Sequence, residues 1–118
     1  MKLYRAQRRS TRHIEGVTNL KRELIQHGPL SVCIASPAWL SRYRSGIYMA
    51  RNMENVDAGN HSIELIGWDE SPGHEPFWIL LNNYGRNWGI NGTMRIRMGQ
   101  NDALVEAYAY TTDPDVSN

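Results

Sequence analysis

Residues Asn60–Gly92, NHSIELIGWDESPGHEPFWILLNNYGRNWGING, contain two apolar runs separated by a polar segment. The runs, His61–Trp68 and Pro76–Asn83, have the composition of β-strands. The segment between them is rich in turn-forming residues: Asp69, Glu70, Ser71, Pro72 and Gly73. This pattern predicts an antiparallel β-hairpin.

The predicted hairpin brings a histidine and an asparagine together. His61 opens the first run, and Asn82 lies near the end of the second. Antiparallel pairing sets the start of one strand beside the end of the next. We therefore expect the two side chains within hydrogen-bond reach, about 2.7–3.2 Å between heavy atoms. A histidine held by a side-chain amide is the base and the orienting group of a nucleophilic triad. The stretch contains no obvious nucleophile.

Two ordered motifs in this stretch resemble signatures of the papain-like cysteine peptidases, most closely their cathepsin B-like branch. The first is a histidine that follows a small or polar residue and leads into a buried strand ending in Gly-Trp, here residues 60–68. The second has the form Asn-Ser-Trp-Gly, two residues, Trp-Gly, one residue, Asn-Gly. Here it reads NNYGRNWGING at residues 82–92. The glycines, Trp88 and Asn91 are in register, whereas Asn83 and Tyr84 replace the family's serine and first tryptophan.

Upstream segments resemble the same family. Leu20–Leu24 and His27–Val32 look like the helix and strand that open the C-terminal half of the papain fold. Tyr43–Tyr48, YRSGIY, resembles the family's Tyr-Lys-Ser-Gly-Val-Tyr segment. The resemblance covers roughly Leu20–Tyr110, which is half of a peptidase. It implies an α+β fold: a mostly antiparallel, partly closed β-barrel-like domain with one main helix.

Hydrophobic periodicity predicts the elements of the first half of the chain. Thr18 is expected to cap a helix that runs to about His27, with Gly28 as its stop. Leu30–Ala35 reads as a buried strand. The apolar side of the helix is expected to carry Leu20, Leu24 and Ile25.

The second half reads as strands and polar segments. Asn52–Gly59 is expected to be an exposed loop, and Gly92–Met98 a half-buried strand. Ala103–Tyr110 alternates in the same way, and Thr111–Asn118 is expected to fray. We divide the chain into a basic N-terminal strand or linker (1–17), the papain-like domain (18–110) and a frayed tail (111–118).

Composition limits the classes of function. The chain has 118 residues, 41% of them hydrophobic, which suits one globular domain. A net charge of +1 gives no electrostatic reason to expect nucleic acid as a partner, and no apolar run is long enough to predict a membrane helix. The basic N-terminus lacks the apolar core of a secretory signal. The histidines show no metal-ligand spacing, so we predict neither a metal nor a cofactor.

Cys33 is the single cysteine, which excludes an intrachain disulfide. Papain-like peptidases are usually lysosomal or secreted and carry several bridges, one of them in this half. Ala103 stands where that bridge would have a cysteine, so the compartment stays open. Cys33 lies in a predicted strand and not at a helix start, where thiolates are stabilised. We expect it to be a buried thiol that reacts slowly.

The resemblance assigns roles around the predicted pair. His61 would be the base that forms an ion pair with a thiolate, and Asn82 would accept the other imidazole N–H. Tyr84 takes the place of an indole that shields this hydrogen bond from water. The site wall and substrate contacts would comprise Cys33, Asn60, Tyr84 and Trp88. The family's segment with the nucleophilic cysteine and the oxyanion-hole glutamine is absent from this sequence.

Three hypotheses on function follow. The chain could supply the His/Asn part of a peptidase whose Cys-bearing half comes from another chain or segment. It could instead be an inactive pseudoenzyme that acts as a binding or scaffold module. In the third hypothesis the basic N-terminus docks to an acidic partner or RNA, which the charge balance disfavours. The first two predict that another chain covers the surface around His61, Tyr84 and Trp88: a Cys-bearing half, a different protein or a second copy. A peptide is the expected substrate of an active assembly.

Overall fold

The computed structural model describes residues 6–37, 40–49 and 56–114. These residues form one α-helix and a seven-stranded sheet in the order β1-β7-β2-β4-β5-β6-β3. All strand pairs are antiparallel except β3–β6, which is parallel. The predicted α+β, mostly antiparallel class with one main helix is confirmed. The elements are β1 (Ala6–Ile14), α1 (Val17–His27), β2 (Leu30–Pro37), β3 (Ile47–Tyr48), β4 (Val56–Asp69), β5 (Phe77–Leu81), β6 (Thr93–Arg97), β7 (Ala109–Pro114) and the 3-10 turns η1 (Leu40–Arg42) and η3 (Asp102–Leu104).

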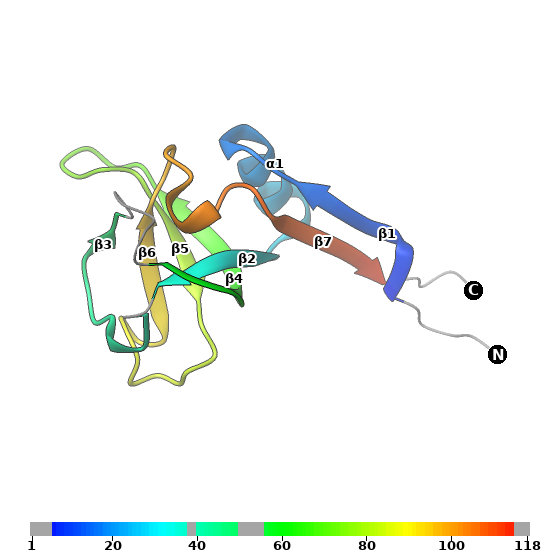
Figure 1. The fold of residues 1–118 in the computed structure, drawn as a ribbon. Helices are drawn as coiled ribbons and strands as arrows, with labels where there is room; N and C mark the ends of the chain where they lie inside the picture. The colour runs from blue at the N-terminus through cyan, green and yellow to red at the C-terminus, as the bar shows by residue number, and fades with distance from the viewer. Residues whose placement is uncertain (1–5, 38–39, 50–55, 115–118) are drawn as a thin grey trace.

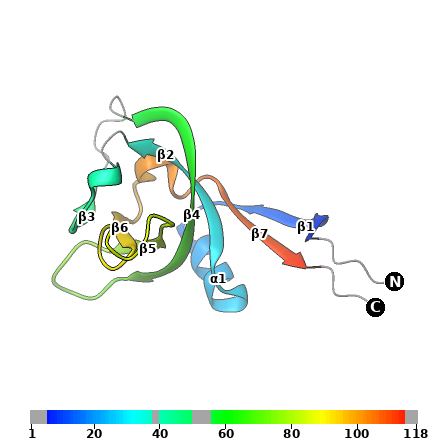
Figure 2. The same ribbon diagram turned by 90° about the horizontal axis from the view of Figure 1, so that it is seen from below.

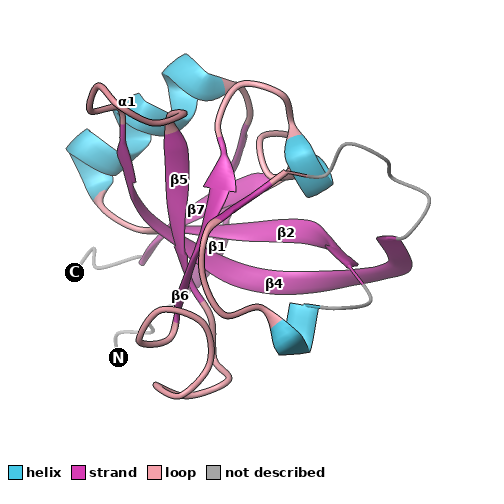
Figure 3. Cartoon of the chain, turned by 90° about the vertical axis from the view of Figure 1, so that its left-hand side faces the viewer, coloured by secondary structure: helices cyan, strands magenta, loops and turns pink. Residues whose placement is uncertain are grey.

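The body of the sheet folds over at β4. This long strand pairs with β2 over residues 56–65 and with β5 over residues 64–69. As a result, β2 and β4 run side by side and cross β5 and β6 at a steep angle (Figure 3). Apolar side chains from the inner faces fill the space between these strands, and Trp78, Leu65, Leu80, Met94 and Ile96 are fully buried. This layout gives the partly closed barrel that was predicted.

Strands β1 and β7 form a ribbon that extends away from this body (Figure 1). The ribbon joins the body of the sheet through β7, which pairs with β2 at Ser31 and Val32. His13 on β1 pairs with Tyr110 and its ring contacts the rings of Tyr108 and Tyr110. The expectation that residues 111–114 fray is wrong, because they pair with β1; residues 115–118 lie outside the described part of the chain.

Helix α1 lies beside β2 and β4 (Figure 2). Its own side chain Leu20 is fully buried. The helix ends at Gly28 as predicted, with φ 95° at that glycine. The predicted cap at Thr18 is wrong: the helix begins at Val17, and Gly16 (φ 91°) is the capping residue. The backbone N–H of Gly16 donates to the carbonyl of Glu106, a tertiary contact that fixes the start of the helix.

Ile25 does not share the buried side of the helix, contrary to our prediction, and is 74% exposed. It lies five positions after Leu20, and a turn of about 100° per residue carries it away from the face that Leu20 and Leu24 share.

Strand β2 is buried on one face only, not throughout. Leu30, Val32 and Ile34 are buried, whereas Cys33 between them is half-buried. The expectation of a buried thiol is therefore wrong, because neighbouring residues on a strand point to opposite faces. The predicted loop at residues 52–59 is also partly wrong, since β4 already begins at Val56; residues 52–55 lie outside the described part of the chain.

The central hairpin of β4 and β5 matches its prediction closely. Its turn is held by Asp69, whose carboxylate accepts the backbone N–H of Ser71 at 2.8 Å. Hydrogen bonds from the Ser71 side chain and backbone lower the pKa of Asp69. Strand β6 follows its prediction as well, with Met94, Ile96 and the adjoining Met98 buried on one face.

The strand predicted at Ala103–Tyr110 forms only from Ala109, where β7 begins. Ala103 and Leu104 have positive φ, which an extended strand does not allow, and both lie in the 3-10 turn η3. The carboxylate of the buried residue Glu106 holds this segment in place through hydrogen bonds. It accepts hydrogen bonds from Trp78 Nε1 (2.7 Å), the Gly99 N–H (2.6 Å) and the Asn101 N–H (3.1 Å).

Candidate active site

The predicted pair of polar side chains forms at one end of the central hairpin. His61 lies on β4 opposite Ile34 of β2, and Asn82 follows the last residue of β5. His61 Nε2 lies 2.8 Å from Asn82 Oδ1, which confirms the distance that the sequence predicted. The histidine is half-buried and the asparagine is buried. The hydrogen bond is therefore largely removed from water, where it holds its geometry better than at the surface.

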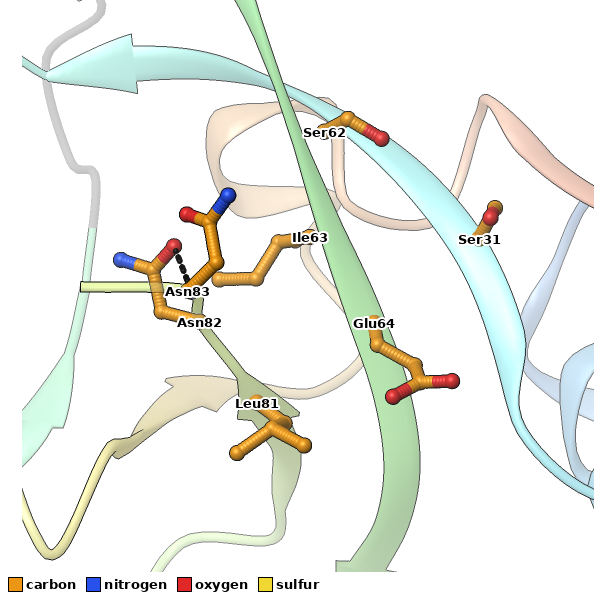
Figure 4. A pocket seen from close by; sticks show the side chains of 7 residues that line it. All are labelled: Ser31, Ser62, Ile63, Glu64, Leu81, Asn82 and Asn83. Atoms are coloured by element: carbon orange, nitrogen blue, oxygen red, sulfur yellow. Dashed lines mark hydrogen bonds between the residues drawn. The ribbon is translucent and has the colours of Figure 1, made fainter. Parts of the chain in front are cut away.

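A backbone hydrogen bond of Asn82 fixes the position of its Cα. The Asn82 N–H donates to the carbonyl of Gly92 at 3.0 Å, so the end of β5 is tied to the glycine-rich loop. The side-chain oxygen accepts a second hydrogen bond, from the Asn83 N–H at 2.9 Å (Figure 4). The atom that faces His61 is thus an acceptor.

This arrangement determines which ring nitrogen of the neutral imidazole carries the proton. Because Oδ1 only accepts, Nε2 of His61 must donate, and the lone pair then resides on Nδ1. Nδ1 has no hydrogen-bond partner within the described residues. A neutral ring with one nitrogen held and the other free is ready to accept a proton from an incoming group.

Aromatic rings back the histidine. The Tyr84 ring lies 5.4 Å from the His61 ring, and the Trp88 ring lies 5.4 Å from Tyr84 in an edge-on arrangement. Tyr84 is 45% exposed, whereas Trp88 is buried and donates its Nε1–H to the carbonyl of Leu40 at 2.8 Å. Trp88 is therefore part of the core behind the site, and Tyr84 is the ring that covers His61 on the open side.

Tyr43 supports Trp88 from the core side. Its ring lies 5.5 Å from the Trp88 ring, and its hydroxyl donates to the carbonyl of Gly46 at 2.5 Å and accepts the Arg95 N–H at 3.2 Å. Burial raises the pKa of the Tyr43 phenol, so it stays protonated as a donor. The site wall thus rests on a fixed stack of rings.

The loop that follows Asn82 requires glycine at Gly89. This residue has φ 59°, and a Cβ there would lie 2.4 Å from the carbonyl oxygen of Thr93. The close approach lets the loop fold back, with the Gly92 N–H donating to the carbonyl of Trp88 at 2.8 Å. Gly85 and Gly92 of the motif have positive φ (95° and 91°), which favours glycine, but a Cβ at either would meet no close contact.

Cys33 and His61 lie on opposite faces of the sheet. Cys33 pairs with Ser62, whereas His61 pairs with Ile34, and side chains alternate along both strands. This register keeps the Cys33 thiol away from the imidazole. Asn60 of β4, another predicted wall residue, pairs with Ala35 of β2, and its side chain lies outside the described part of the chain.

Alkylation of Cys33 should therefore be independent of the histidine. We expect the rate of reaction of the folded chain with iodoacetamide at neutral pH to be the same with His61 and with His61→Ala, because no ion pair activates the thiol. Mass spectrometry of the alkylated chain over time measures this rate. A rate that falls in the His61→Ala variant would show that the two side chains meet in solution.

A pocket of about 270 Å³ lies beside Asn82 and was not predicted. Figure 4 shows its lining: side chains of β2 and β4 on one side and the end of β5 on the other. The lining residues are Ser31, Ser62, Ile63, Glu64, Leu81, Asn82 and Asn83. The sequence does carry a signal for it, since Ser31 and Glu64 are polar residues at alternate positions of apolar runs and pair with each other across the strands.

The described residues contain no group of three or more His, Cys, Asp or Glu side chains placed to hold a metal ion. No helix within the described ranges is long and apolar enough to cross a membrane.

Comparison with known proteins points to one family. Residues 2–112 match the family model described as papain family cysteine protease. Cathepsin B-like protease 1 of Arabidopsis thaliana is 31% identical over 96 residues, which cover 81% of this chain and 25% of that protein. Cathepsin Z of Onchocerca volvulus is 37% identical over 84 residues, which cover 70% of this chain and 26% of that protein.

A solved structure gives the same result. Procathepsin B S9 from Trypanosoma congolense superposes with a TM-score of 0.78 and 26% sequence identity, over 90% of this chain and 36% of that chain. The chain spans about a quarter of the length of the curated relatives it matches.

Proposed function

We propose, since the chain belongs to the papain family of cysteine proteases, that it supplies the histidine and asparagine of a peptidase site. A Cys-bearing half from another chain or segment completes the site, and the substrate is a peptide. The observation that carries the proposal is the 2.8 Å hydrogen bond from His61 Nε2 to Asn82 Oδ1, which leaves Nδ1 free.

In this mechanism His61 transfers a proton in each half of the reaction. Nδ1 takes the proton of the incoming thiol, and the resulting thiolate attacks the carbonyl carbon of the peptide bond. The imidazolium then gives that proton from Nδ1 to the nitrogen of the leaving amine as the C–N bond breaks, which leaves a thioester. A water molecule gives a proton to Nδ1 as it attacks the thioester carbon, and that proton passes to the sulfur as the C–S bond breaks. Asn82 Oδ1 holds Nε2–H throughout, and its hydrogen bond strengthens while the ring is positively charged. Tyr84 limits the access of water to that bond.

We also propose that the Cys-bearing half covers the exposed apolar residues beside the site. Leu81, which lines the pocket next to Asn82, is 39% exposed, and Tyr84, whose ring contacts His61, is 45% exposed. An apolar surface left open around the pair is of the kind that a partner covers.

Reconstitution tests the proposal. The chain alone should not hydrolyse fluorogenic dipeptide substrates, because none of its described residues brings a thiolate to His61. Addition of a separately produced Cys-bearing half of a cathepsin B-like relative should produce hydrolysis that a thiol-alkylating inhibitor blocks. Hydrolysis by the chain alone that survives Cys33→Ser would refute the proposed division of the site.

The alternative is an inactive binding module with the same fold. The observation that favours it is the 45% exposure of Tyr84, which leaves the His61–Asn82 hydrogen bond less covered than a larger ring would. A complex that forms with the Cys-bearing half and sediments as one species, yet hydrolyses no peptide, would support this alternative.

A further inference from the structure

The side-chain amide of Asn82 is held from two directions. Its Oδ1 accepts a hydrogen bond from His61 Nε2 at 2.8 Å. It accepts a second, drawn in Figure 4, from the backbone N–H of Asn83 at 2.9 Å. The other end of the amide, Nδ2, is buried and has no hydrogen-bond partner within the described residues. Two donors therefore converge on one atom, while the neighbouring donor is left without an acceptor.

An amide in this position has two orientations of nearly equal shape. A half-turn about the Cβ–Cγ bond exchanges Oδ1 and Nδ2. With oxygen toward His61, the ring must carry its proton on Nε2 and its lone pair on Nδ1. With Nδ2 toward His61, the amide would donate to Nε2, and the ring proton would move to Nδ1. The second arrangement removes the free lone pair on Nδ1.

His61 cannot choose between these orientations, because its ring accepts either partner by changing tautomer. A backbone N–H has no such freedom, since it can only donate. The Asn83 N–H therefore favours oxygen on its side of the amide. In the flipped orientation Nδ2 would face the Asn83 N–H donor, and Oδ1 would be buried where the structure places no donor.

We propose that Asn83 is a positioning residue: its backbone N–H orients the Asn82 amide and thereby fixes the tautomer of His61. The exposed Asn83 side chain takes no part. The Asn82 backbone is already anchored through its N–H to Gly92, so the amide rotation is the freedom that this contact removes. The role of the tautomer in peptide hydrolysis rests on the proposed function, whereas the tautomer itself is a property of this chain.

Nuclear magnetic resonance of the ring nitrogens tests the proposal on the full chain alone, at a pH where the imidazole is neutral. The signals of His61 are assigned by their loss in His61→Ala. We expect a protonated Nε2 and an unprotonated Nδ1 in the unmodified chain and in Asn83→Ala, which keeps the N–H. Asn83→Pro removes the N–H, and both tautomers should then be populated.

A rescue separates this effect from a general disturbance by proline. Asp in place of Asn82 presents an oxygen at both ends, so its orientation no longer matters. The double variant Asn82→Asp, Asn83→Pro should therefore regain the single Nε2–H tautomer. A single tautomer in Asn83→Pro itself, or a mixture in Asn83→Ala or in the double variant, would overturn the proposal.

Hydrogen exchange provides a second measurement if Asn83→Pro does not fold. Asn82→Ala should speed the exchange of the Asn83 N–H by about tenfold, as the loss of one hydrogen bond implies, whereas Asn82→Asp should keep it protected. Equal exchange in both variants would overturn the proposal. None of these measurements needs a Cys-bearing half, so they can fail while reconstituted hydrolysis succeeds, and the reverse.

Discussion

Replacement of His61 by alanine should reduce peptide hydrolysis by the reconstituted assembly by about 10³-fold or more, the range in which a positioned general base contributes. The variant keeps the fold, because the half-buried imidazole makes one side-chain hydrogen bond, to Asn82. It removes the group that takes the thiol proton and returns it to the leaving amine. The loss should appear in kcat, measured with fluorogenic dipeptides at saturating substrate.

Two further variants make this result specific. Asn82→Ala leaves the imidazole in place but frees it to rotate and change tautomer, so we expect a smaller loss of about 10²-fold, the lower end of acid–base contributions. His74→Ala removes an exposed histidine in the turn between β4 and β5, where its ring packs on Phe77, and should have no effect on the rate. Unchanged hydrolysis in His61→Ala would refute the role assigned to the pair.

The His61–Asn82 pair could be predicted from the sequence because it depends on local geometry. Both residues belong to one hairpin, and a turn of recognisable composition joins its strands. The hydrogen bond from the Asn83 N–H could not be predicted in this way. Every residue except proline carries the same backbone donor, so no residue type marks the one that meets a side chain.

The elements that were assigned wrongly depend on contacts distant in sequence. Thr18 is a better capping residue than Gly16 by composition, but the Gly16 N–H is held by the carbonyl of Glu106. Residues 111–114 have no apolar pattern of their own, and their strand exists because β1 pairs with it from the other end of the chain. Long-range pairing of this kind overrides local propensity.

The segment around Glu106 was misread for a related reason. Apolar residues alternate there as in a strand, but two of them, Ala103 and Leu104, adopt positive φ. The segment is shaped by a buried carboxylate that collects hydrogen bonds from Trp78 on β5 and from two backbone N–H groups. The local sequence pattern cannot show that a hydrogen-bond donor on another strand, here Trp78 Nε1 on β5, will contact this segment.

Glu106→Ala should therefore be the most destabilising single change among the polar residues described here. The variant leaves Trp78 Nε1 and the N–H groups of Gly99 and Asn101 without their acceptor, in a region where Trp78 is fully buried. The buried Trp78 donor left unpaired costs about 1–3 kcal/mol, and the N–H groups of the exposed residues Gly99 and Asn101 each lose a hydrogen bond to a charged group. We therefore expect the free energy of unfolding to fall by about 3 kcal/mol. Urea unfolding followed by tryptophan fluorescence measures the change.

Glu106→Gln distinguishes lost hydrogen bonds from lost volume. Oε2 accepts from both Trp78 and Gly99, and Oε1 accepts from Asn101 alone. A glutamine that keeps its oxygen at the Oε2 position preserves two of these bonds and sets its NH₂ against the Asn101 N–H. The loss should then be about 1–2 kcal/mol, close to that of one unpaired donor. Glu75→Ala, which removes an exposed carboxylate, should leave stability within about 0.5 kcal/mol. If Glu106→Gln were as unstable as Glu106→Ala, the charge of the carboxylate, and not its acceptor geometry, would hold the segment together.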